Sequence, residues 1–556
     1  MSELFQELVK KRGYSEAFLD PKYEACFSPF LLPEMKKATK RITEAAEKGE
    51  KVLIYGDYDV DGVTASTVMN DTLKLAGIED VAIMLPDRFR DGYGMSKKVV
   101  QEAKEQGRTL VITVDCGSGN WEIVEELKKE GIEAVITDHH EVPERLPEAV
   151  AVVNPKRRDV QNFIEEEKLE TEAEKLVELR DLAGVGVAFE VARALVLEGK
   201  IPAGQEKWLL DLVLIGTLCD SMRMSEENRR LCFYGMKVLK KTRRAGLKEL
   251  LRLIGKQELS SEVIGFQIGP RLNAAGRMSS ARKALDLLMS KNRAEAAKLA
   301  MELNKLNTQR RSEQDAAVRE IAERGEVEKE EPVLVYSGAW HEGVLGIIAG
   351  KLVEKYKRPA FILTETEEGF KGSGRSFGEF NLAEALKSCQ KEIISGGGHA
   401  GACGVKIKRG KLKDFTQAVN NYYRGLKLFD QERFLEERED LAVQGLGNFN
   451  LDFLEELKKL EPFGVGNRVP VFLLLNMMIL DKGLMGDEGQ HLRLLVRGEG
   501  EGVMKLLAFN APESWLGVER GERANLWVNV ERNEFRGTTS VEGRILKMGL
   551  VREGEI

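Results

Sequence analysis

Short apolar segments alternate with helical segments in the first third of the chain. The apolar runs are Val52–Tyr55, Leu110–Val114, Ala134–Thr137 and Ala149–Val153. Amphipathic segments such as Glu122–Glu130 lie between several of these runs. Strands that alternate with helices favour a parallel sheet covered by helices. The pattern therefore predicts an α/β domain in this part of the chain.

The pattern changes further along the chain. The segment Asn292–Lys329 is charged and carries Ala and Leu at helical spacing, which predicts a long connecting helix. A second strand–helix–strand pattern starts at Pro332 with VLVYSG, GVLGIIAGKLVEKY and AFILTE. Beyond about residue 446, apolar and polar residues alternate between Gly-rich turns, as in a small β-barrel.

These changes predict two α/β domains joined by a long helix, with a β-barrel at the C-terminal end. The expected parts are an N-terminal helical segment (1–50), a first α/β domain (51–290), the connecting helix (291–330), a second α/β domain (331–430) and the barrel (446–556). The very acidic stretch 157–181 is interpreted as a solvated helix or excursion.

Composition narrows the class of protein. A chain of 556 residues is too long for one ordinary core, so about three domains are expected. No apolar run reaches the roughly 18 residues that a membrane span needs. The six cysteines form no C-x-x-C pair, which is typical of free thiols in a reducing compartment. We therefore expect a cytoplasmic protein without a membrane partner.

Polar clusters follow the predicted strands of the first domain. They are Gly56–Gly62 (GDYDVDG), Asp115–Gly117 (DCG), Asp138–His140 (DHH) and Asn154-Pro155. Functional groups gather at the carboxyl ends of strands in open α/β sheets. Crowded carboxylates repel one another unless a cation binds them. Carboxylate oxygens with imidazoles suit manganese, with magnesium as the alternative.

Each cluster, taken alone, also has an interpretation that involves no metal site. An aspartate after a strand is usually a turn or N-cap residue. The D-x-D-x-D-G run also resembles half an EF-hand, although no Glu stands at the twelfth loop position. An adjacent histidine pair is hard to explain in this way, because the whole chain has only five histidines. Taken together, the clusters predict a metal site.

GDYDVDG, VDCG and DHH, in this order, resemble the motifs of the DHH phosphoesterase superfamily. The helix WLLDLVLIGTLCD ends in Asp220, which fits the superfamily's fourth motif. The resemblance implies two metal ions and the ligands Asp59, Asp61, Asp115, His139 and Asp220, with Asp115, His139, His140 and Asp220 in the catalytic centre. Many members have a histidine where this chain has Tyr55, and we expect Asp57 to replace it as a ligand.

Further motifs resemble one branch of the superfamily, the RecJ-type exonucleases. They are LPDR (85–88), GPRLNAAGRM (269–278), WHEG (340–343), GRS (374–376), SGGGHAG (395–401) and EPFGVGN (461–467). Taken alone, the second motif would be interpreted as a turn with two solvated arginines. A Gly cluster, likewise, usually just makes a turn. The resemblance implies a DHH domain, a DHH-associated C-terminal domain and an OB-fold. It also implies substrate contacts by Arg88, Arg271, Asn273, Arg277, Arg375, Ser376 and His399.

The implied activity is metal-dependent hydrolysis of single-stranded DNA from its 5′ end, releasing nucleotides in recombination and repair. Two manganese ions, single-stranded DNA, a single-strand-binding protein and a helicase are the implied cofactors and partners, and a monomer is expected. OB-folds bind single strands through basic and aromatic residues, although most aromatics also fill the barrel. Candidate contacts are Phe509, Trp527, Arg532, Phe535 and Arg536.

Two other functions are weighed against this one. A small-substrate DHH enzyme acting on nano-RNA, cyclic dinucleotides or pyrophosphate would normally lack the barrel and the GPRLNAAGR segment. A non-enzymatic relative acting as a scaffold would be expected to lose metal ligands, whereas at least five are present here. The net charge of −7 argues against a protein that coats DNA through bulk charge, but a local basic groove remains compatible with it.

Overall fold

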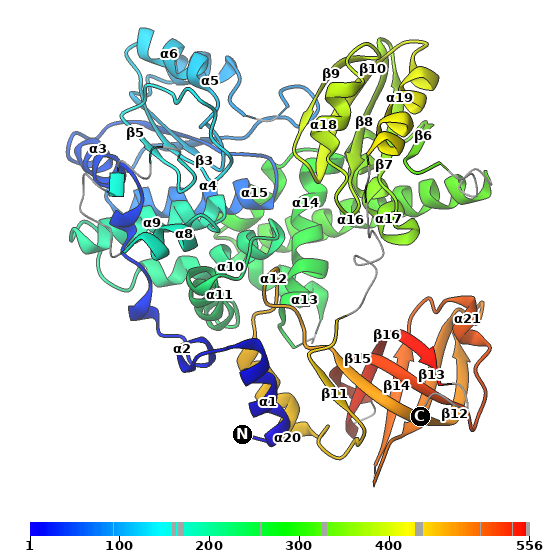
Figure 1. Cartoon of the computed structure of the whole chain (residues 1–556). Coiled ribbons are helices and arrows are strands. Elements are labelled where there is room, and N and C mark those ends of the chain that lie inside the picture. The colour runs from blue at the N-terminus through cyan, green and yellow to red at the C-terminus, as the bar shows by residue number, and fades with distance from the viewer. Residues whose placement is uncertain are drawn as a thin grey trace. The chain divides into compact units, whose positions relative to one another are not determined.

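The computed structural model describes residues 1–551, except 93, 158, 160–162, 165–171, 256–257, 325–330, 427, 429–437, 501 and 536–537. The chain forms two compact units (Figure 1). The barrel unit contains Met1–Phe27, Ser221–Met236 and Glu436–Ile556, and the α/β unit contains Ser28–Asp220 and Lys237–Leu435. In the described part, no helix is both long and apolar enough to cross a membrane.

The first sheet of the α/β unit is parallel, and its strand order is β2-β1-β3-β4-β5. The strands are β1 Val52–Tyr55, β2 Val81–Met84, β3 Leu110–Val114, β4 Glu133–Thr137 and β5 Ala151–Val153. The order reverses between β1 and β3, and ligands of such sheets bind at this switch point, beyond the carboxyl ends of the strands. The edge strand β2 is half-buried, and the apolar pattern had not revealed it.

Helices cover both faces of this sheet. Helices α5 (Lys98–Glu105) and α6 (Trp121–Lys129) pack on one face through an apolar cluster that includes the side chains of β1 and β3. On the other side lie α4 (Val60–Leu75), α9 (Gly184–Leu197) and α10 (Leu210–Cys219), which are buried along most of their length. Helix α3 (Met35–Glu47) packs near β5. The carboxyl ends of β1 and β3 therefore open onto the N-termini of α4 and α9.

A helical region links the two sheets. It contains α12 Ala245–Ile254, α13 Ser261–Val263, the π-helix η5 Ile264–Ile268, α14 Gly269–Met278, α15 Arg282–Met289 and α16 Arg293–Glu323. Helix α11 (Glu226–Leu239) lies mostly in the Ser221–Met236 segment of the barrel unit. Helix α16 has 31 residues and corresponds to the predicted connecting helix. Of the acidic stretch 157–181, α8 (Ala173–Leu179) is helical as expected, whereas 158, 160–162 and 165–171 lie outside the described residues.

The second sheet is mixed, with strand order β6-β7-β8-β10-β9. Its strands are β6 Leu334–Gly338, β7 Ala360–Thr366, β8 Gly369–Arg375, β9 Ile393–Gly398 and β10 Ala402–Lys408. Helix α17 (Leu345–Tyr356) belongs to one apolar core, and α18 (Leu382–Ser388) and α19 (Leu412–Gly425) belong to another. Alternating burial along β10 matches a strand with one face in a core.

The barrel unit is built on a closed five-stranded barrel, β12-β13-β14-β16-β15, which the β12–β15 pairing closes. Its strands are β12 Phe472–Met485, β13 His491–Arg497, β14 Val503–Ala508, β15 Arg523–Phe535 and β16 Thr538–Leu550, and β11 (Leu441–Val443) adds to β12. Helix α20 (Leu451–Leu457) shares the barrel's core. The predicted fold class, two α/β domains, a long helix and a C-terminal barrel, is confirmed.

Of the predicted N-terminal segment 1–50, residues Met1–Phe27 belong to the barrel unit, which the sequence pattern did not indicate, and the remainder belongs to the α/β unit. Helix α1 (Glu3–Arg12) buries Leu4, Phe5 and Leu8 in the barrel's core. Its last residue, Arg12, forms a bidentate ion pair with Asp440, with N–O distances of 2.8 and 2.7 Å. Helix α2 (Glu16–Leu19) follows.

One buried arginine joins three segments of this unit. The Arg229 side chain, on α11, donates to the carbonyl oxygens of Phe18, Lys459 and Glu461 at 2.6–3.0 Å, and its guanidinium lies 3.9 Å from the centre of the Phe18 ring. Its hydrogen-bond acceptors are all main-chain carbonyls. Burial lowers the pKa of Arg229 to about 10, so it remains charged at neutral pH.

We expect Arg229→Ala to destabilise the barrel unit by about 3–5 kcal/mol, because it leaves buried carbonyl groups without donors. The free energy of opening can be measured by hydrogen exchange of the amides of α20 in increasing urea. Arg532→Ala is the control, because Arg532 forms only exposed ion pairs with Glu455 and Glu534 and should change stability by less than about 1 kcal/mol. Equal effects of the two changes would contradict the role given to Arg229.

Candidate metal centre and arginine cluster

The loop after β1 supplies three carboxylates because it runs directly into α4. Asp59 is the N-cap of α4, and its Oδ1 accepts the Gly62 N–H at 3.1 Å. Asp61 lies in the first turn of α4 and accepts the N–H groups of Gly184 and Val185 at 2.6 and 2.9 Å. These two amides begin α9, so a second helix N-terminus faces the Asp61 carboxylate. Both helix ends therefore fix the carboxylates at the switch point of the sheet.

Asp115 follows β3 in a conformation that side chains seldom adopt. Its φ is 60°, in the left-handed region, and its side chain is buried. The start of α9 approaches it closely, since a Cβ on Gly184 would lie 2.5 Å from the Asp115 Cβ. A glycine at 184 is therefore needed for Asp61 to reach the helix N-terminus beside Asp115. Strained backbone of this kind is often found at functional sites.

His139 lies at the centre of the carboxylates. Its Nε2 is 3.0 Å from Asp115 Oδ1 and 3.6 Å from both Asp61 Oδ2 and Asp220 Oδ2. These contacts lack hydrogen-bond geometry, because both ring nitrogens and Asp115 Oδ1 are buried without a hydrogen-bond partner among the described residues. Asp57 Oδ1 is in the same situation. Unpaired buried polar atoms that converge on one point are what a cation site requires.

The pKa values of the clustered carboxyl groups also indicate that the site requires a positive charge. Burial and then the charge of Asp59 raise the pKa of Asp57 to about 8 and that of Asp61 to about 7. Burial and Asp61 raise the pKa of Asp220 to about 8, and the pKa of Asp115 is also well above its usual range. In contrast, burial lowers the pKa of His139 to about 3. A neutral imidazole is a good metal ligand, and bound cations would allow the carboxylates to ionise.

The candidate ligands fall into overlapping groups whose atoms lie within 4.8 Å of one another. The groups are Asp57, Asp59 and Asp115; Asp61, His139 and Asp220; and Asp115, His139 and His140. Asp115 and His139 each belong to two of these groups. Oxygen ligands with one or two imidazoles fit manganese or magnesium. The structure thus brings together all of the residues proposed as metal ligands.

Tyr55 does not face this cluster. Its hydroxyl donates to Gly94 O at 3.0 Å, and its ring belongs to the apolar core beneath α5 and α6. Asp57 instead contributes a carboxylate, which supports the proposal that it takes the place of the histidine found in many members of the superfamily.

Asp138 was not among the predicted site residues, but it organises the second histidine. Its Oδ1 lies 2.9 Å from His140 Nδ1, and its Oδ2 accepts the Ser118 N–H at 3.0 Å. Burial alone would lower the pKa of His140, but the hydrogen bond and the charge of Asp138 raise it to about 9. In the metal-free protein, Asp138 therefore favours the protonated form of His140. In the sequence, the position of Asp138 directly before the histidine pair was the signal that could have identified it as a site residue.

Three of the predicted substrate-binding arginines come together. Burial, and then the charges of Arg88, Arg375 and Arg310, lower the pKa of Arg277 to about 9. Arg277 donates to Gly343 O at 3.3 Å, and a Cβ on Gly343 would lie 1.9 Å from Arg277 O. Arg88 stacks on Tyr58, 4.2 Å from the ring centre. Crowded cations of this kind suit a bound anion such as a phosphate. Arg310, on α16, was not predicted.

The other predicted contacts are engaged locally. Ser376 Oγ donates to Phe380 O, and His399 Nδ1 accepts the Gly401 N–H at 3.2 Å. Asn273 Oδ1 is buried without a partner among the described residues. Arg271 contacts α16 and is not part of the arginine cluster. Arg375 itself lies beside α17, since a Cβ on Gly346 would be 2.9 Å from its Nη2.

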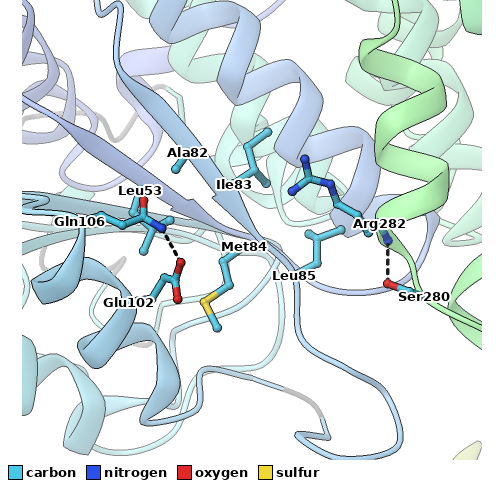
Figure 2. A pocket seen from close by; sticks show the side chains of 9 residues that line it. All are labelled: Leu53, Ala82, Ile83, Met84, Leu85, Glu102, Gln106, Ser280 and Arg282. Atoms are coloured by element: carbon cyan, nitrogen blue, oxygen red, sulfur yellow. Dashed lines mark hydrogen bonds between the residues drawn. The ribbon is translucent and has the colours of Figure 1, made fainter. Parts of the chain in front are cut away.

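A cavity of about 270 Å³ lies elsewhere, along the edge strand β2 (Figure 2). Glu102 of α5 and Gln106, which directly follows α5, line one side of it, and Ser280 and Arg282 line the other (Figure 2). None of its lining residues is a candidate metal ligand, so we assign the chemistry to the carboxylate cluster and not to this cavity.

Several candidate contacts of the barrel are already paired. The Trp527 indole N–H donates to Glu439 at 3.1 Å, and Arg532 pairs with glutamates. Phe509 is half-exposed beside His491, with a ring-centre distance of 5.4 Å. The Phe535 side chain and Arg536 lie outside the described residues.

Comparisons with known proteins agree with this architecture. Residues 51–217 match the DHH family, N-terminal domain; residues 330–425 match the DHHA1 domain; and residues 442–547 match the RecJ OB domain. The single-stranded-DNA-specific exonuclease RecJ of Bacillus subtilis (strain 168) is 35% identical over 96% of this chain and 66% of its own length. The protein of the same name from Haemophilus influenzae is 32% identical over 94% of this chain and 92% of its own length.

A crystal structure of RecJ in complex with Mn²⁺ from Thermus thermophilus has the same fold. It matches with a TM-score of 0.79 and 27% identity, over 98% of this chain and 75% of the other. The ordered motifs, the cluster of carboxylates at the switch point, the three matched domains and the identity over nearly the whole chain lead to one conclusion. This chain belongs to the RecJ family of single-stranded-DNA-specific exonucleases.

Proposed function

We propose that this chain hydrolyses the phosphodiester bonds of single-stranded DNA from the 5′ end and releases nucleotides, using two divalent metal ions, most simply manganese. The observation that carries this proposal is the convergence of Asp57, Asp61, Asp115, His139 and Asp220 next to an arginine cluster, with buried atoms of Asp57, Asp115 and His139 that have no hydrogen-bond partner among the described residues. The solved relative bound to Mn²⁺ supports the choice of metal.

The residues of the chain divide the work. Asp57, Asp59, Asp61, Asp115, His139 and Asp220 would hold the ions. Bound divalent ions supply an activated water at neutral pH and offset the charge that develops on the phosphate. Asp138 orients His140 and keeps it protonated, so this imidazole can donate to a phosphate oxygen. Arg88, Arg277 and Arg375 bind and orient the phosphate of the strand.

The proposal extends to the setting of the reaction. We place the enzyme in DNA recombination and repair in the cytoplasm, as a monomer that works with a single-strand-binding protein and a helicase. The RecJ OB domain match supports single-stranded DNA as the substrate, because such barrels bind single strands.

The decisive experiment is digestion of labelled oligonucleotides with manganese. Single strands carrying a block at the 5′ or at the 3′ end, and the matching duplex, are incubated with the full chain. We expect mononucleotides from the strand blocked at the 3′ end, and no digestion of the strand blocked at the 5′ end or of the duplex. Digestion that survives a 5′ block would contradict the proposed polarity.

We expect His139→Ala to abolish hydrolysis while leaving the fold intact, because it removes the central ligand and leaves crowded carboxylates uncompensated. The affinity for manganese, measured by isothermal titration calorimetry, should fall at least about 100-fold, beyond the 10- to 100-fold typical of changes to residues that only orient ligands. His491→Ala, in the barrel, should bind manganese as the wild type does. Wild-type turnover by His139→Ala at equal manganese would refute the assignment.

We expect Arg375→Ala to weaken binding of the DNA strand and to leave the hydrolysis step largely unchanged. The loss of one charge-assisted contact should cost about 1.5–3 kcal/mol of interaction free energy. This loss should lower kcat/KM on a 5′-phosphorylated oligonucleotide roughly ten- to a hundredfold. Hydrolysis of a small artificial phosphodiester should fall much less. Arg409→Ala is the matched control, because Arg409 is an exposed arginine of the same domain. If both substrates lost the same factor, Arg375 would take part in the chemical step.

A further inference from the structure

The most exposed large apolar side chain in the described part of the α/β unit is Phe266, which is 73% exposed. It lies in the middle of η5, a five-residue π-helix. Ile264 and Ile268 of the same turn are fully buried, so the turn is anchored and Phe266 projects from it. π-Helical turns are rare and are frequently found at functional sites.

The π-helix is tied to the metal centre on one side. Gly269 follows it and packs against Cys219, because a Cβ on Gly269 would lie 2.4 Å from the Cys219 Sγ. The next residue along α10 is the candidate ligand Asp220. A group held by η5 is therefore positioned relative to the carboxylate cluster by direct packing.

A cation is bound to the residue that follows Phe266. Arg271 Nη1 donates to the main-chain and side-chain oxygens of Gln267 at 2.8 and 2.9 Å, and its Nε donates to Asn304 Oδ1 at 3.0 Å. Its acceptors are all uncharged, and within the described chain its Nη2 has no hydrogen-bond partner. The guanidinium is thus oriented by neutral groups and keeps its charge available for an external anion.

Helix α16 extends this surface. Met301, Asn304, Thr308 and Arg311 follow one another at intervals of three or four residues and so share one helix face. Met301 is 67% exposed, and Arg311 is near enough to lower the pKa of Arg271 after the effect of burial. The surface therefore combines an exposed aromatic, a second apolar side chain and two arginines.

We propose that Phe266, Arg271, Met301 and Arg311 form a second contact for single-stranded DNA, in which one base stacks on Phe266 and the adjoining phosphate binds Arg271. Aromatic rings beside uncompensated cations are the usual means of holding a single strand without reading its sequence. This inference rests on the proposed function for the choice of ligand. It adds a contact on η5, α14 and α16 that uses none of the candidate metal ligands and none of Arg88, Arg277 and Arg375.

The test uses a 5′-phosphorylated, fluorescent oligothymidylate in which a single abasic site is moved along the strand. Binding to the full chain is followed by anisotropy in EDTA, which prevents hydrolysis. The wild type should bind about five- to a hundredfold more weakly when the abasic site falls at the base that stacks on Phe266. In Phe266→Ala that position-specific loss should vanish, because the ring no longer distinguishes a base from its absence. Phe266→Trp should keep it.

Two further variants separate the components. Arg271→Gln should make the dependence of log affinity on log salt shallower by about 0.7, the value for one phosphate contact on a single strand. Leu197→Ala is the control, because Leu197 is 63% exposed at the end of α9 and its loss should leave both readouts unchanged. Since Phe266 is exposed, its replacement should leave thermal unfolding as in the wild type.

The outcomes distinguish this inference from the function on which it rests. A wild-type chain that digests single strands but has the same abasic profile as Phe266→Ala would overturn the stacking contact. A wild-type chain that has the Phe266-dependent profile but digests no strand would support the contact and overturn the proposed exonuclease activity.

Discussion

Repulsion between like charges at the carboxyl ends of β1 and β3 is the constraint on which the α/β unit depends. Several carboxylates are buried within a few ångströms of one imidazole, and their raised pKa values show that the protein alone does not stabilise their charges. The fold nevertheless holds them there. The N-termini of α4 and α9 offset part of the charge of Asp59 and Asp61, and the unusual φ of Asp115 aims its side chain into the same space. Bound cations would relieve this repulsion and allow the carboxylates to ionise.

Positive charges are crowded together in the arginine cluster. Arg88, Arg277 and Arg375 come from three separate segments, and their mutual repulsion lowers the pKa of Arg277 in addition to the effect of burial. Bound metal ions would neutralise the excess negative charge of the carboxylates, and a bound phosphate would neutralise the excess positive charge of the arginines. A strand of DNA with bound metals therefore neutralises both at once, which is why the geometry suits phosphodiester hydrolysis better than simple metal storage.

The sequence was most informative where local pattern and chemistry coincide. The strands β1, β3, β4 and β5, the long α16 and the candidate ligands from Asp57 to Asp220 were all predicted, because buried strands are apolar and their ends carry the aspartates and histidines. The edge strand β2 was missed, since four half-buried residues give no strong period. Asp138, Arg310 and Phe266 were missed for another reason. Asp138 and Arg310 interact with residues distant in sequence, Ser118 and Arg277, and the turn that carries Phe266 is joined to α16 by the Arg271–Asn304 hydrogen bond, which only the folded chain creates.

The make-up of the barrel unit has a consequence for biosynthesis. Ser2 donates its N–H to Glu456 at 2.8 Å, Tyr14 donates its hydroxyl to Asn467 at 2.7 Å, and Arg229 joins residues 18, 459 and 461. Residues at the start of the chain thus find their partners only after more than four hundred others have been translated. The α/β unit has most of its partners earlier and can begin to fold on the ribosome, while α1 and α2 wait with their apolar faces uncovered. During synthesis, the uncovered apolar residues of these first helices form the kind of exposed surface that chaperones bind.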